Sequence, residues 1–229
     1  MNGPHAPSWT AALQKELASL SSHGVFSCVE LPPGKTAIDG KYVFKVKDSS
    51  DPQKPTFKVR FVGKGFQQKP GVDFSEFFSP TLRMTALRMF LSISAAKQHS
   101  IRHYDVDAAF LNAELKEEMY INIPPGAQKP TPTSVWKLHK VLYGLKQANK
   151  AWKDDLTNTL ISAGYRPTTA EPCLYIPYTP QDSPWPATML MTYCPQHPAQ
   201  PHMIFSCRPC PFSIPLRILA QSTNLLGFR

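Results

Sequence analysis

Apolar residues along the chain recur with the spacings of both helices and strands. A repeat of three to four residues predicts amphipathic helices over 9–20, 82–98 and 148–160, the last of them ending at Gly164. A two-residue alternation bounded by turn residues predicts strands over 25–31, 42–46, 57–61, 102–106, 119–123 and 135–138. Helices and strands in this mixed order predict the α+β class.

The strands at 42–46 and 57–61 are predicted to pair across a turn at 51–52, with basic residues on one face. Lys58 and Arg60 are two residues apart, so they point to the same side of their strand. Cations placed in this way can bind phosphate, and they can equally protect an exposed strand edge. The spacing alone leaves both interpretations open.

Two more segments carry residue types suited to chemistry. Asp105 and Asp107 project to one side at the end of a predicted strand, where carboxylates can hold a divalent cation such as Mg²⁺; an Asx turn explains the same pair. A turn at 144–147 leads into a helix with Lys150 and Trp152. This pattern is consistent with a basic binding turn and with a basic helix start that carries a core tryptophan.

Charge adds a bias toward polyanionic partners. The 229-residue chain has 25 Lys and Arg against 16 Asp and Glu, a net charge of +9, and the 22 basic and 15 acidic residues of the first 176 leave +7 there. A hydrophobic fraction of 42% can fill a core, which excludes wholesale disorder. We expect no membrane span, no secretory signal and, with five cysteines, no disulfide framework; an intracellular location, cytoplasmic or nuclear, follows.

The last part of the sequence differs in composition from the rest. Ten of the 24 prolines lie in 177–229, lysine is absent there, and Asp182 is the only acidic residue after Glu171. Globular surfaces normally interleave both signs of charge, so this segment is unlike a continuation of the same domain. We predict an N-terminal extension at 1–8, a folded region at 9–176, and an irregular, proline-rich tail at 177–229 that arises from a shifted reading frame or a mispredicted exon.

Between Trp9 and Tyr175 the motifs, taken in order, resemble the reverse transcriptase of copia-type LTR retrotransposons. The segments that carry the resemblance are SWTAALQKELASL, GKYVFKVK, FKVRFVGKGFQQKPGVDFSEFFSPTLRMTALR, YDVDAAFLNAELKEEMYINIPPG, VWKLHKVLYGLKQANKAW and AGYRPTTAEPCLY. The resemblance implies an α+β polymerase fingers-and-palm fragment, with an antiparallel sheet and packed helices, from a retrotransposon polyprotein. It also implies RNA-directed DNA polymerase activity, in which two Mg²⁺ ions assist transfer of a deoxynucleotide to a primer 3′-hydroxyl on an RNA or DNA template.

The resemblance assigns roles to single residues. Asp105 matches the first catalytic aspartate, a ligand of both metal ions, and the backbone carbonyl of Val106 would complete that metal site. Lys58 and Arg60 match the cations that bind the triphosphate. Phe110 matches the aromatic gate that packs under the incoming sugar and rejects a 2′-hydroxyl.

Further matches concern the turn before the last predicted helix. Gly144 and Gln147 match the turn that positions the templating base pair near the primer 3′-hydroxyl. Lys150 stands where the family usually has arginine, which weakens a bidentate phosphate contact. Asp107 stands where relatives commonly carry lysine, so the resemblance does not make it a metal ligand.

The family's second catalytic element, a paired aspartate in a hairpin, is missing. Residues 187–194 resemble the first strand of that hairpin, but the next two positions are Pro195 and Gln196. Two-metal catalysis needs opposed carboxylates, so we expect this copy to be inactive. We also expect that aspartates at these two positions would not restore activity, because the return strand of the hairpin is not recognisable in the sequence.

Two other functions stay open for this sequence. One is a non-enzymatic nucleic-acid-binding remnant retained for its basic surface. The other is a zinc-binding adaptor formed by the tail, where Cys194, His197, His202 and Cys207 offer the ligand types of a zinc knuckle. Prolines between these positions and the absence of glycine among them argue against the zinc site.

Overall fold

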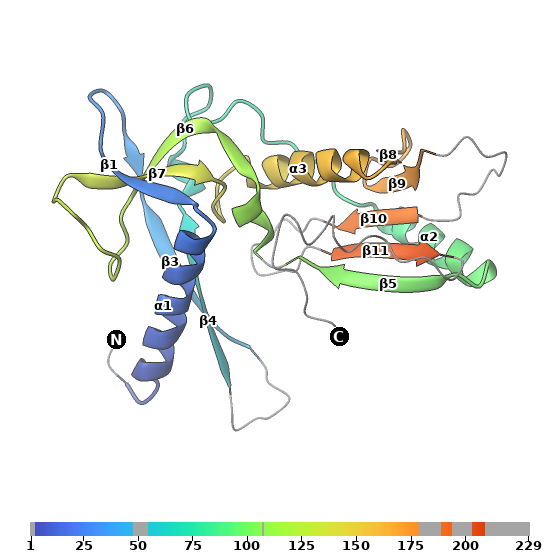
Figure 1. Cartoon of the computed structure of the whole chain (residues 1–229), viewed down its shortest axis with the longest axis horizontal. Helices are drawn as coiled ribbons and strands as arrows, with labels where there is room; N and C mark the ends of the chain where they lie inside the picture. Colours follow the sequence, from blue (N-terminus) through green and yellow to red (C-terminus); the bar gives the residue numbers. More distant parts are fainter. Residues whose placement is uncertain (1–2, 48–54, 107, 179–188, 194–202, 209–229) are drawn as a thin grey trace. The chain divides into compact units, whose positions relative to one another are not determined.

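The computed structural model describes residues 3–47, 55–106, 108–178, 189–193 and 203–208 of the chain. The described helices are α1 Ala6–Ser22, α2 Met84–Ala96 and α3 Ala148–Ser162, with short 3-10 helices η1 Gly65–Gln67 and η2 Ala109–Asn112. The described strands are β1 Phe26–Glu30, β2 Ala37–Ile38, β3 Gly40–Lys47, β4 Thr56–Gly63, β5 Ser100–Asp105, β6 Glu114–Asn122, β7 Ser134–Lys140, β8 Tyr165–Pro167, β9 Leu174–Pro177, β10 Met189–Tyr193 and β11 Met203–Arg208 (Figure 1).

The chain divides into two compact units. Unit 1 consists of Met1–Phe77 and Phe110–Ala151, and unit 2 consists of Phe78–Ala109 and Trp152–Arg229. Each unit is built from segments that are distant in the sequence. Across the part of the chain that the structure describes, none of the helices combines the length and apolar character needed to cross a bilayer.

Unit 1 contains a four-stranded sheet in the order β1-β7-β6-β2. β7 pairs antiparallel with both β1 and β6, and β2 pairs parallel with β6. Trp136 on β7 is buried and stacks on Phe26 of β1, with 3.7 Å between the ring centroids. Phe61 of β4 meets the same indole edge-on at 5.7 Å, so this tryptophan joins the sheet to β4 in one core.

A separate two-stranded ribbon is formed by β3 and β4. The strands run antiparallel, in register from Gly40 opposite Gly63 to Lys47 opposite Thr56. Along β4, Val59 and Phe61 alternate with Lys58 and Arg60, and the two apolar side chains are only 3% and 0% exposed. The ribbon therefore has one apolar face and one basic face, as the alternation in the sequence predicted.

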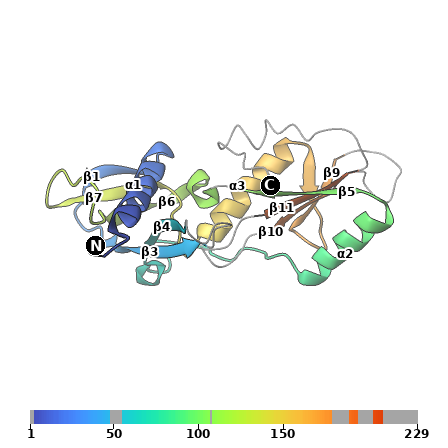
Figure 2. The same cartoon turned by 90° about the horizontal axis from the view of Figure 1, so that it is seen from below.

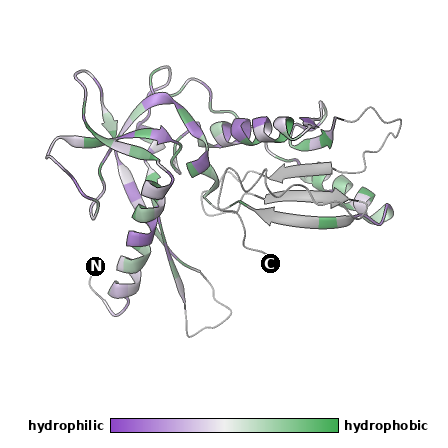
Figure 3. Cartoon of the chain, in the orientation of Figure 1, coloured by the Kyte–Doolittle hydropathy of each residue, from purple (hydrophilic) through white to green (hydrophobic). Residues whose placement is uncertain are grey.

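Helix α1 lies along β4 and covers the apolar face of the ribbon (Figure 1). Trp9 of α1 meets Phe44 of β3 and Phe57 of β4 edge-on, with centroid distances of 5.3 and 4.6 Å. Leu13 and Leu20, on later turns of the helix, are buried. Figure 3 shows hydrophobic and hydrophilic residues in alternating bands along α1, which is the pattern of an amphipathic helix with one packed side.

Glu16 of α1 links the helix to β4. Its Oε1 accepts a hydrogen bond from the backbone N–H of Phe61 at 3.0 Å. Burial raises the pKa of this carboxyl above its ordinary value, while the Phe61 hydrogen bond and the charges of Arg60, Lys58 and His23 lower it, and burial is the largest of these effects. Folding therefore shifts Glu16 toward its protonated form.

We expect Glu16 to make stability depend on pH. Because its pKa is higher in the folded chain than in the unfolded chain, its favourable contribution is complete below the unfolded pKa and is lost as the pH rises through the folded value. Glu16→Gln keeps an acceptor for the Phe61 N–H and removes the titration. The variant should therefore gain stability relative to the parent chain as the pH rises from about 4 to about 7.

Urea unfolding at several pH values measures this effect, with Glu114→Gln, a change at an exposed glutamate of the same unit, as the matched control. A stability difference between Glu16→Gln and the parent chain that stays constant with pH would contradict the expectation.

Unit 2 contains a five-stranded antiparallel sheet in the order β5-β11-β10-β9-β8. Helix α2 lies on one face of this sheet, where its buried Ala86 and Phe90 pack with Leu174 and Ile176 of β9 (Figure 2). The apolar positions of α2 return every three to four residues, so one side of the helix covers the sheet.

Helix α3 contributes a buried lysine to unit 2. Lys153 is 6% exposed, and its ammonium donates to the hydroxyl of Tyr175 at 2.5 Å and to the carbonyl of Pro172 at 2.9 Å. The hydroxyls of Thr157 and Tyr175 are 2.8 Å apart. These bonds satisfy polar groups that would otherwise be costly to bury, and they fix α3 to β9.

The structure confirms the α+β class and most of the predicted elements. The predicted helices correspond to α1, α2 and α3, and Gly164 follows α3 with a φ of +84°. The six predicted strands correspond to β1, β3, β4, β5, β6 and β7. The short strands β2, β8 and β9 were not predicted, because a few residues do not display a recognisable alternation.

The prediction of an irregular tail is wrong for two segments. Met189–Tyr193 forms β10, the expected first hairpin strand, and Met203–Arg208 forms β11, which pairs antiparallel with both β10 and β5. The sequence MIFSCR is an uncharged run up to its last residue, and inserting it between two strands satisfies backbone groups on both of its edges. Prolines on both sides of this run dominate the composition of the tail, so the strand was not predicted from the sequence. The boundaries at 8/9 and 176/177, which concern where the family-like sequence begins and ends, stay predictions.

Candidate functional site

The site of unit 1 is built on the basic face of β4. The guanidinium carbon of Arg60 lies 5.1 Å from the ring centroid of Tyr143, over its face. Phe110, on η2, meets the same ring edge-on at 5.3 Å. Tyr143 and Phe110 are 7% and 4% exposed, so the cation rests on a buried aromatic support. The structure thus brings together two residues that the sequence singled out, Arg60 and Phe110, through one that it did not, Tyr143.

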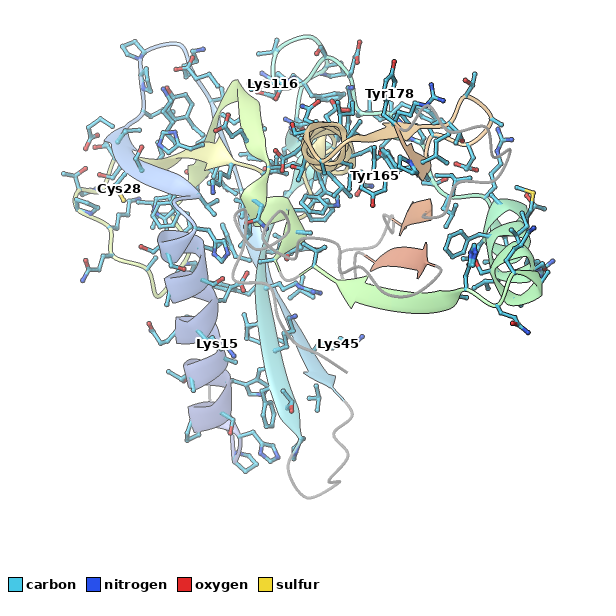
Figure 4. All side chains as sticks on the ribbon, turned by 45° about the vertical axis from the view of Figure 1, so that its right-hand side comes forward. Lys15, Cys28, Lys45, Lys116, Tyr165 and Tyr178 are labelled. Carbon is cyan, nitrogen blue, oxygen red and sulfur yellow. The ribbon has the colours of Figure 1, made fainter. Side chains whose placement is uncertain are left out.

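Lys58 lies two residues before Arg60 on the same face of β4. In the register of the ribbon it stands directly opposite Lys45 of β3. Figure 4 labels Lys45 on β3. Lys58 is half-buried and Lys45 is exposed. Two cations directly opposite each other repel, which makes this position suited to an anionic ligand.

The turn at Gly144 packs against the end of β4. Gly144 has a φ of +87°, and a Cβ atom at this position would lie 2.4 Å from the carbonyl oxygen of Gly63 and 2.4 Å from Cγ1 of Val62. A Cβ on Gly65 would lie 2.2 Å from the carbonyl oxygen of Gly144. The backbone N–H of Gly63 donates to the carbonyl of Tyr143 at 2.8 Å. Glycine is therefore required on both sides of this contact.

Gln147 holds the other end of the turn. Its Oε1 accepts a hydrogen bond from Nε2 of Gln68 at 2.9 Å, and its own Nε2 donates to the carbonyl of Asp73 at 3.2 Å. Oε1 of Gln68 accepts from the backbone N–H of Lys146 at 2.8 Å. Both glutamines are 3% exposed. Gln147 thus acts as a positioning residue that fixes the shape of the turn.

Lys150 and Lys64 each form an ion pair with an acidic side chain. The ammonium of Lys150 lies 3.4 Å from a carboxylate oxygen of Glu76. The ammonium of Lys64 lies 3.3 Å from Oδ2 of Asp39. Hydrogen bonds from Asn122, Gln67 and Lys64, in that order of size, lower the pKa of Asp39 to about 2. Both pairs are partly exposed and join segments of unit 1 that are distant in the sequence, so each contributes little to stability.

In unit 2, Asp105 is the last residue of β5, and Val106, which follows it, is buried. Asp105 stands opposite Met203, the first residue of β11, and Met203 stands opposite Tyr193, the last residue of β10. The end of β10 and the start of β11 therefore lie at the same edge of the sheet as Asp105. The residues of the hairpin's connection, 194–202, lie outside the described residues.

The donor set of this sheet edge does not fit two Mg²⁺ ions. Neither β10 nor β11 contains an acidic residue, and the sequence of 194–202 contains none either. Asp107 lies outside the described residues. Within the described chain, no group of three or more His, Cys, Asp and Glu residues could hold a metal ion. A two-metal site needs opposed carboxylates, and here the sequence offers Asp105 without the second pair.

The zinc hypothesis stays a prediction. Cys194, His197 and His202 lie outside the described residues, and Cys207 lies on β11, opposite Met189 of β10.

Sequence reasoning missed Tyr143, Gln68 and Lys45. All three lie within the motifs that carry the family resemblance, in VLYGLKQANKAW, FKVRFVGKGFQQ and GKYVFKVK. The roles of Tyr143 and Gln68 depend on contacts between segments far apart in the chain, such as the one between Gln68 and Gln147. A single sequence contains no pattern that reports such a contact.

Comparison with known proteins identifies the family. Residues 23–183 match the family described as reverse transcriptase (RNA-dependent DNA polymerase). The retrovirus-related Pol polyprotein from transposon TNT 1-94 of Nicotiana tabacum is 41% identical over 165 residues, which cover 72% of this chain and 12% of that polyprotein. The corresponding polyproteins from transposons RE1 and RE2 of Arabidopsis thaliana are 35% and 34% identical over 170 residues, which cover 73% of this chain and 12% of each polyprotein.

The chain therefore spans about 12% of the length of these curated relatives. The family match covers well over half of the chain and includes the β3–β4 ribbon, the Gly144 turn and Asp105. On this basis the chain belongs to the reverse transcriptase family and is a fragment of the copia-type reverse transcriptase of a retrotransposon Pol polyprotein.

Proposed function

We propose that unit 1 is the fingers part and unit 2 the palm part of an RNA-directed DNA polymerase, and that this copy binds its substrates without catalysing nucleotidyl transfer. The substrates are a deoxynucleoside triphosphate and an RNA or DNA template paired with a primer. Unit 1 supplies the binding contacts, and Asp105 of unit 2 is the remaining catalytic carboxylate.

The contact chain Arg60–Tyr143–Phe110 carries this proposal. A guanidinium held over an aromatic face keeps its planar set of donors oriented for bidentate phosphate contact. The buried ring of Phe110 behind Tyr143 suits a rigid floor for the sugar. Gly144, next to Tyr143, ties this floor to β4.

The expected loss of catalysis follows from the missing second pair of carboxylates. In the two-metal mechanism, opposed carboxylates hold the metal ions between the primer hydroxyl and the triphosphate. Positioning and electrostatic stabilisation supply most of the rate in phosphoryl transfer. Asp105 without the second pair is therefore expected to leave a binding protein with activity lower by orders of magnitude.

Binding of a deoxynucleoside triphosphate tests the proposal. We expect Lys58→Ala/Arg60→Ala to weaken triphosphate affinity by about tenfold to a hundredfold, because hydrogen bonds to charged groups contribute about 1.5–3 kcal/mol. Affinity for a primed RNA–DNA duplex should fall less, since other basic residues also contact its backbone. Isothermal titration of the full chain measures both affinities.

The matched control is Lys15→Ala/Lys116→Ala, which removes the same charge from α1 and β6 (Figure 4). If the control and the Lys58→Ala/Arg60→Ala variant lose triphosphate affinity equally, the binding reflects net charge, and the polymerase assignment of unit 1 is wrong.

A further inference from the structure

Asp39, which lies between β2 and β3, joins several segments of unit 1 by hydrogen bonds. Its backbone N–H donates to Oε1 of Gln67 at 2.7 Å, and its carbonyl accepts from the backbone N–H of Lys64 at 2.8 Å. Its carboxylate accepts from Nδ2 of Asn122 at 2.8 Å, from Nε2 of Gln67 at 3.1 Å and from Nζ of Lys64 at 3.3 Å. The residue thus connects the start of β3 with the end of β6 and with both ends of η1.

Helix η1 depends on such outside contacts for its orientation. It is a three-residue 3-10 helix with hydrogen bonds from the N–H of Gln67 to the carbonyl of Lys64 and from the N–H of Gln68 to the carbonyl of Gly65. A 3-10 helix of this length is only marginally stable by itself, because its hydrogen-bond geometry is poor. The bonds of Asp39 to Lys64 and Gln67 therefore fix where η1 lies in unit 1.

The same short helix carries the contacts that hold the 144–147 turn. The side chain of Gln68, directly after η1, is hydrogen-bonded to backbone and side-chain groups of the turn. Gly65, the first residue of η1, packs so closely that a Cβ there would lie 2.2 Å from a carbonyl oxygen of the turn. Tyr143 precedes the turn, and its ring lies under the guanidinium of Arg60. A displacement of η1 would therefore move the support of the proposed triphosphate site.

We propose that Asp39 is a positioning residue for triphosphate binding, because it holds η1 where this helix fixes the 144–147 turn and the aromatic support of Arg60. The proposal rests on the proposed function, which assigns triphosphate binding to Lys58 and Arg60. Asp39 acts through η1 and not through its charge, since a negative charge in the same unit weakens the binding of anions. Removing that charge would by itself tighten triphosphate binding, so a loss of affinity reveals the positioning role.

The hydrogen bond between the side chains of Asp39 and Gln67 can be broken and then rebuilt with donor and acceptor exchanged. Asn122, Gln67 and Lys64 all present N–H groups to the carboxylate. Asp39→Asn places an amide donor among these donors, and Gln67→Glu places a second carboxylate against the first. In the double variant Asp39→Asn/Gln67→Glu, the new amide donates to the new carboxylate, and the net charge equals that of the parent chain.

Isothermal titration of the full chain with a deoxynucleoside triphosphate measures the effect on binding. We expect Asp39→Asn and Gln67→Glu each to weaken affinity by about threefold to thirtyfold, the range for residues that act through a packed network. The double variant should return to within about twofold of the parent affinity.

Hydrogen exchange of the Lys146 amide, which donates to Oε1 of Gln68 at 2.8 Å, reports the position of η1 without any ligand. Its exchange should become faster in both single variants and return to the parent rate in the double variant. Circular dichroism checks that each variant folds.

The matched control is Glu118→Gln. Glu118 also belongs to unit 1, and its side chain is 44% exposed against 43% for Asp39. Side-chain hydrogen bonds lower the pKa of both carboxyls to about 2. Glu118 is bonded to Lys35 and Tyr120, which lie outside η1 and the 144–147 turn. Triphosphate affinity and amide exchange in the turn should therefore stay close to the parent values in this variant.

Asp39 has no positioning role if Asp39→Asn leaves the exchange of the Lys146 amide at the parent rate, or if it tightens triphosphate binding as charge alone would. A double variant that binds as weakly as the single variants would also overturn the proposal. Failure of the proposed function is seen separately. Triphosphate affinity that does not depend on Arg60 would refute the polymerase assignment of unit 1, while exchange of the Lys146 amide would still show that Asp39 holds η1.

Discussion

Replacing Pro195 and Gln196 by aspartates is expected to tighten Mn²⁺ binding by about tenfold or more and to create primer extension that requires Asp105. The reason lies in the sheet of unit 2, where Asp105, Met203 and Tyr193 stand level on β5, β11 and β10. The substituted positions follow Tyr193 in the sequence, where the family carries its paired aspartate. The return strand that the sequence did not reveal is β11, so the reason for expecting no restoration no longer holds.

Electron paramagnetic resonance of Mn²⁺ measures the metal affinity without depending on catalysis, and extension of a labelled primer on an RNA template measures activity. The parent chain should show no extension above the Asp105→Asn background. A matched variant, Ala199→Asp/Gln200→Asp, adds the same charge elsewhere in the connection between β10 and β11. Equal metal binding by both double variants, or a gain that survives Asp105→Asn, would mean that added negative charge and not a rebuilt site explains the effect.

Local patterns in the sequence were sufficient to predict the helices and strands that have long, regular repeats of apolar residues. The apolar spacing of α1 and the alternation along β4 each report which side is packed, because Leu13, Leu20 and Phe61 are all buried. β11 shows the limit of this reasoning. Its six residues lie among prolines, and their pairing between β5 and β10 depends on partner strands about a hundred and about ten residues away in the chain. Composition averaged over the tail could not reveal such a strand.

Some residues of the candidate site were predicted from the sequence and others were not, for the same reason. Lys58 and Arg60 were singled out by their spacing on one strand face and then by a family motif, and Phe110 by the family motif alone. The residues that support them were not predicted. The stacking of Arg60 on Tyr143 and the hydrogen bond between Gln68 and Gln147 each join segments that are distant in the sequence. The role of Gln147 near the templating base pair stays a prediction, and the structure adds how its side chain is held. Gln147 uses its amide inside the protein, so it shapes the turn and does not present a free donor to a ligand.

Gly144→Ala is expected to destabilise unit 1 by about 3 kcal/mol or more, the largest effect of any single substitution discussed for this unit. Two causes add. The φ of +87° is unfavourable for alanine, and the new Cβ would lie 2.4 Å from both the Gly63 carbonyl oxygen and Cγ1 of Val62. The first of these is a backbone atom at the end of β4, so relieving the clash requires the turn and the strand to separate.

Gly71→Ala is the matched control, because Gly71 also belongs to unit 1 and has a φ of +76°, but a Cβ there would meet nothing within 4 Å. Its cost should be about 1 kcal/mol, from backbone strain alone. Thermal unfolding compares the two variants, and hydrogen exchange of the Gly63 amide, which donates to Tyr143 at 2.8 Å, reports the local contact. Faster exchange at Gly63 in Gly144→Ala alone would locate the damage at the contact between β4 and the turn. Equal destabilisation by both substitutions would show that the turn yields at little cost, and the rigid support inferred for Arg60 and Tyr143 would then be wrong.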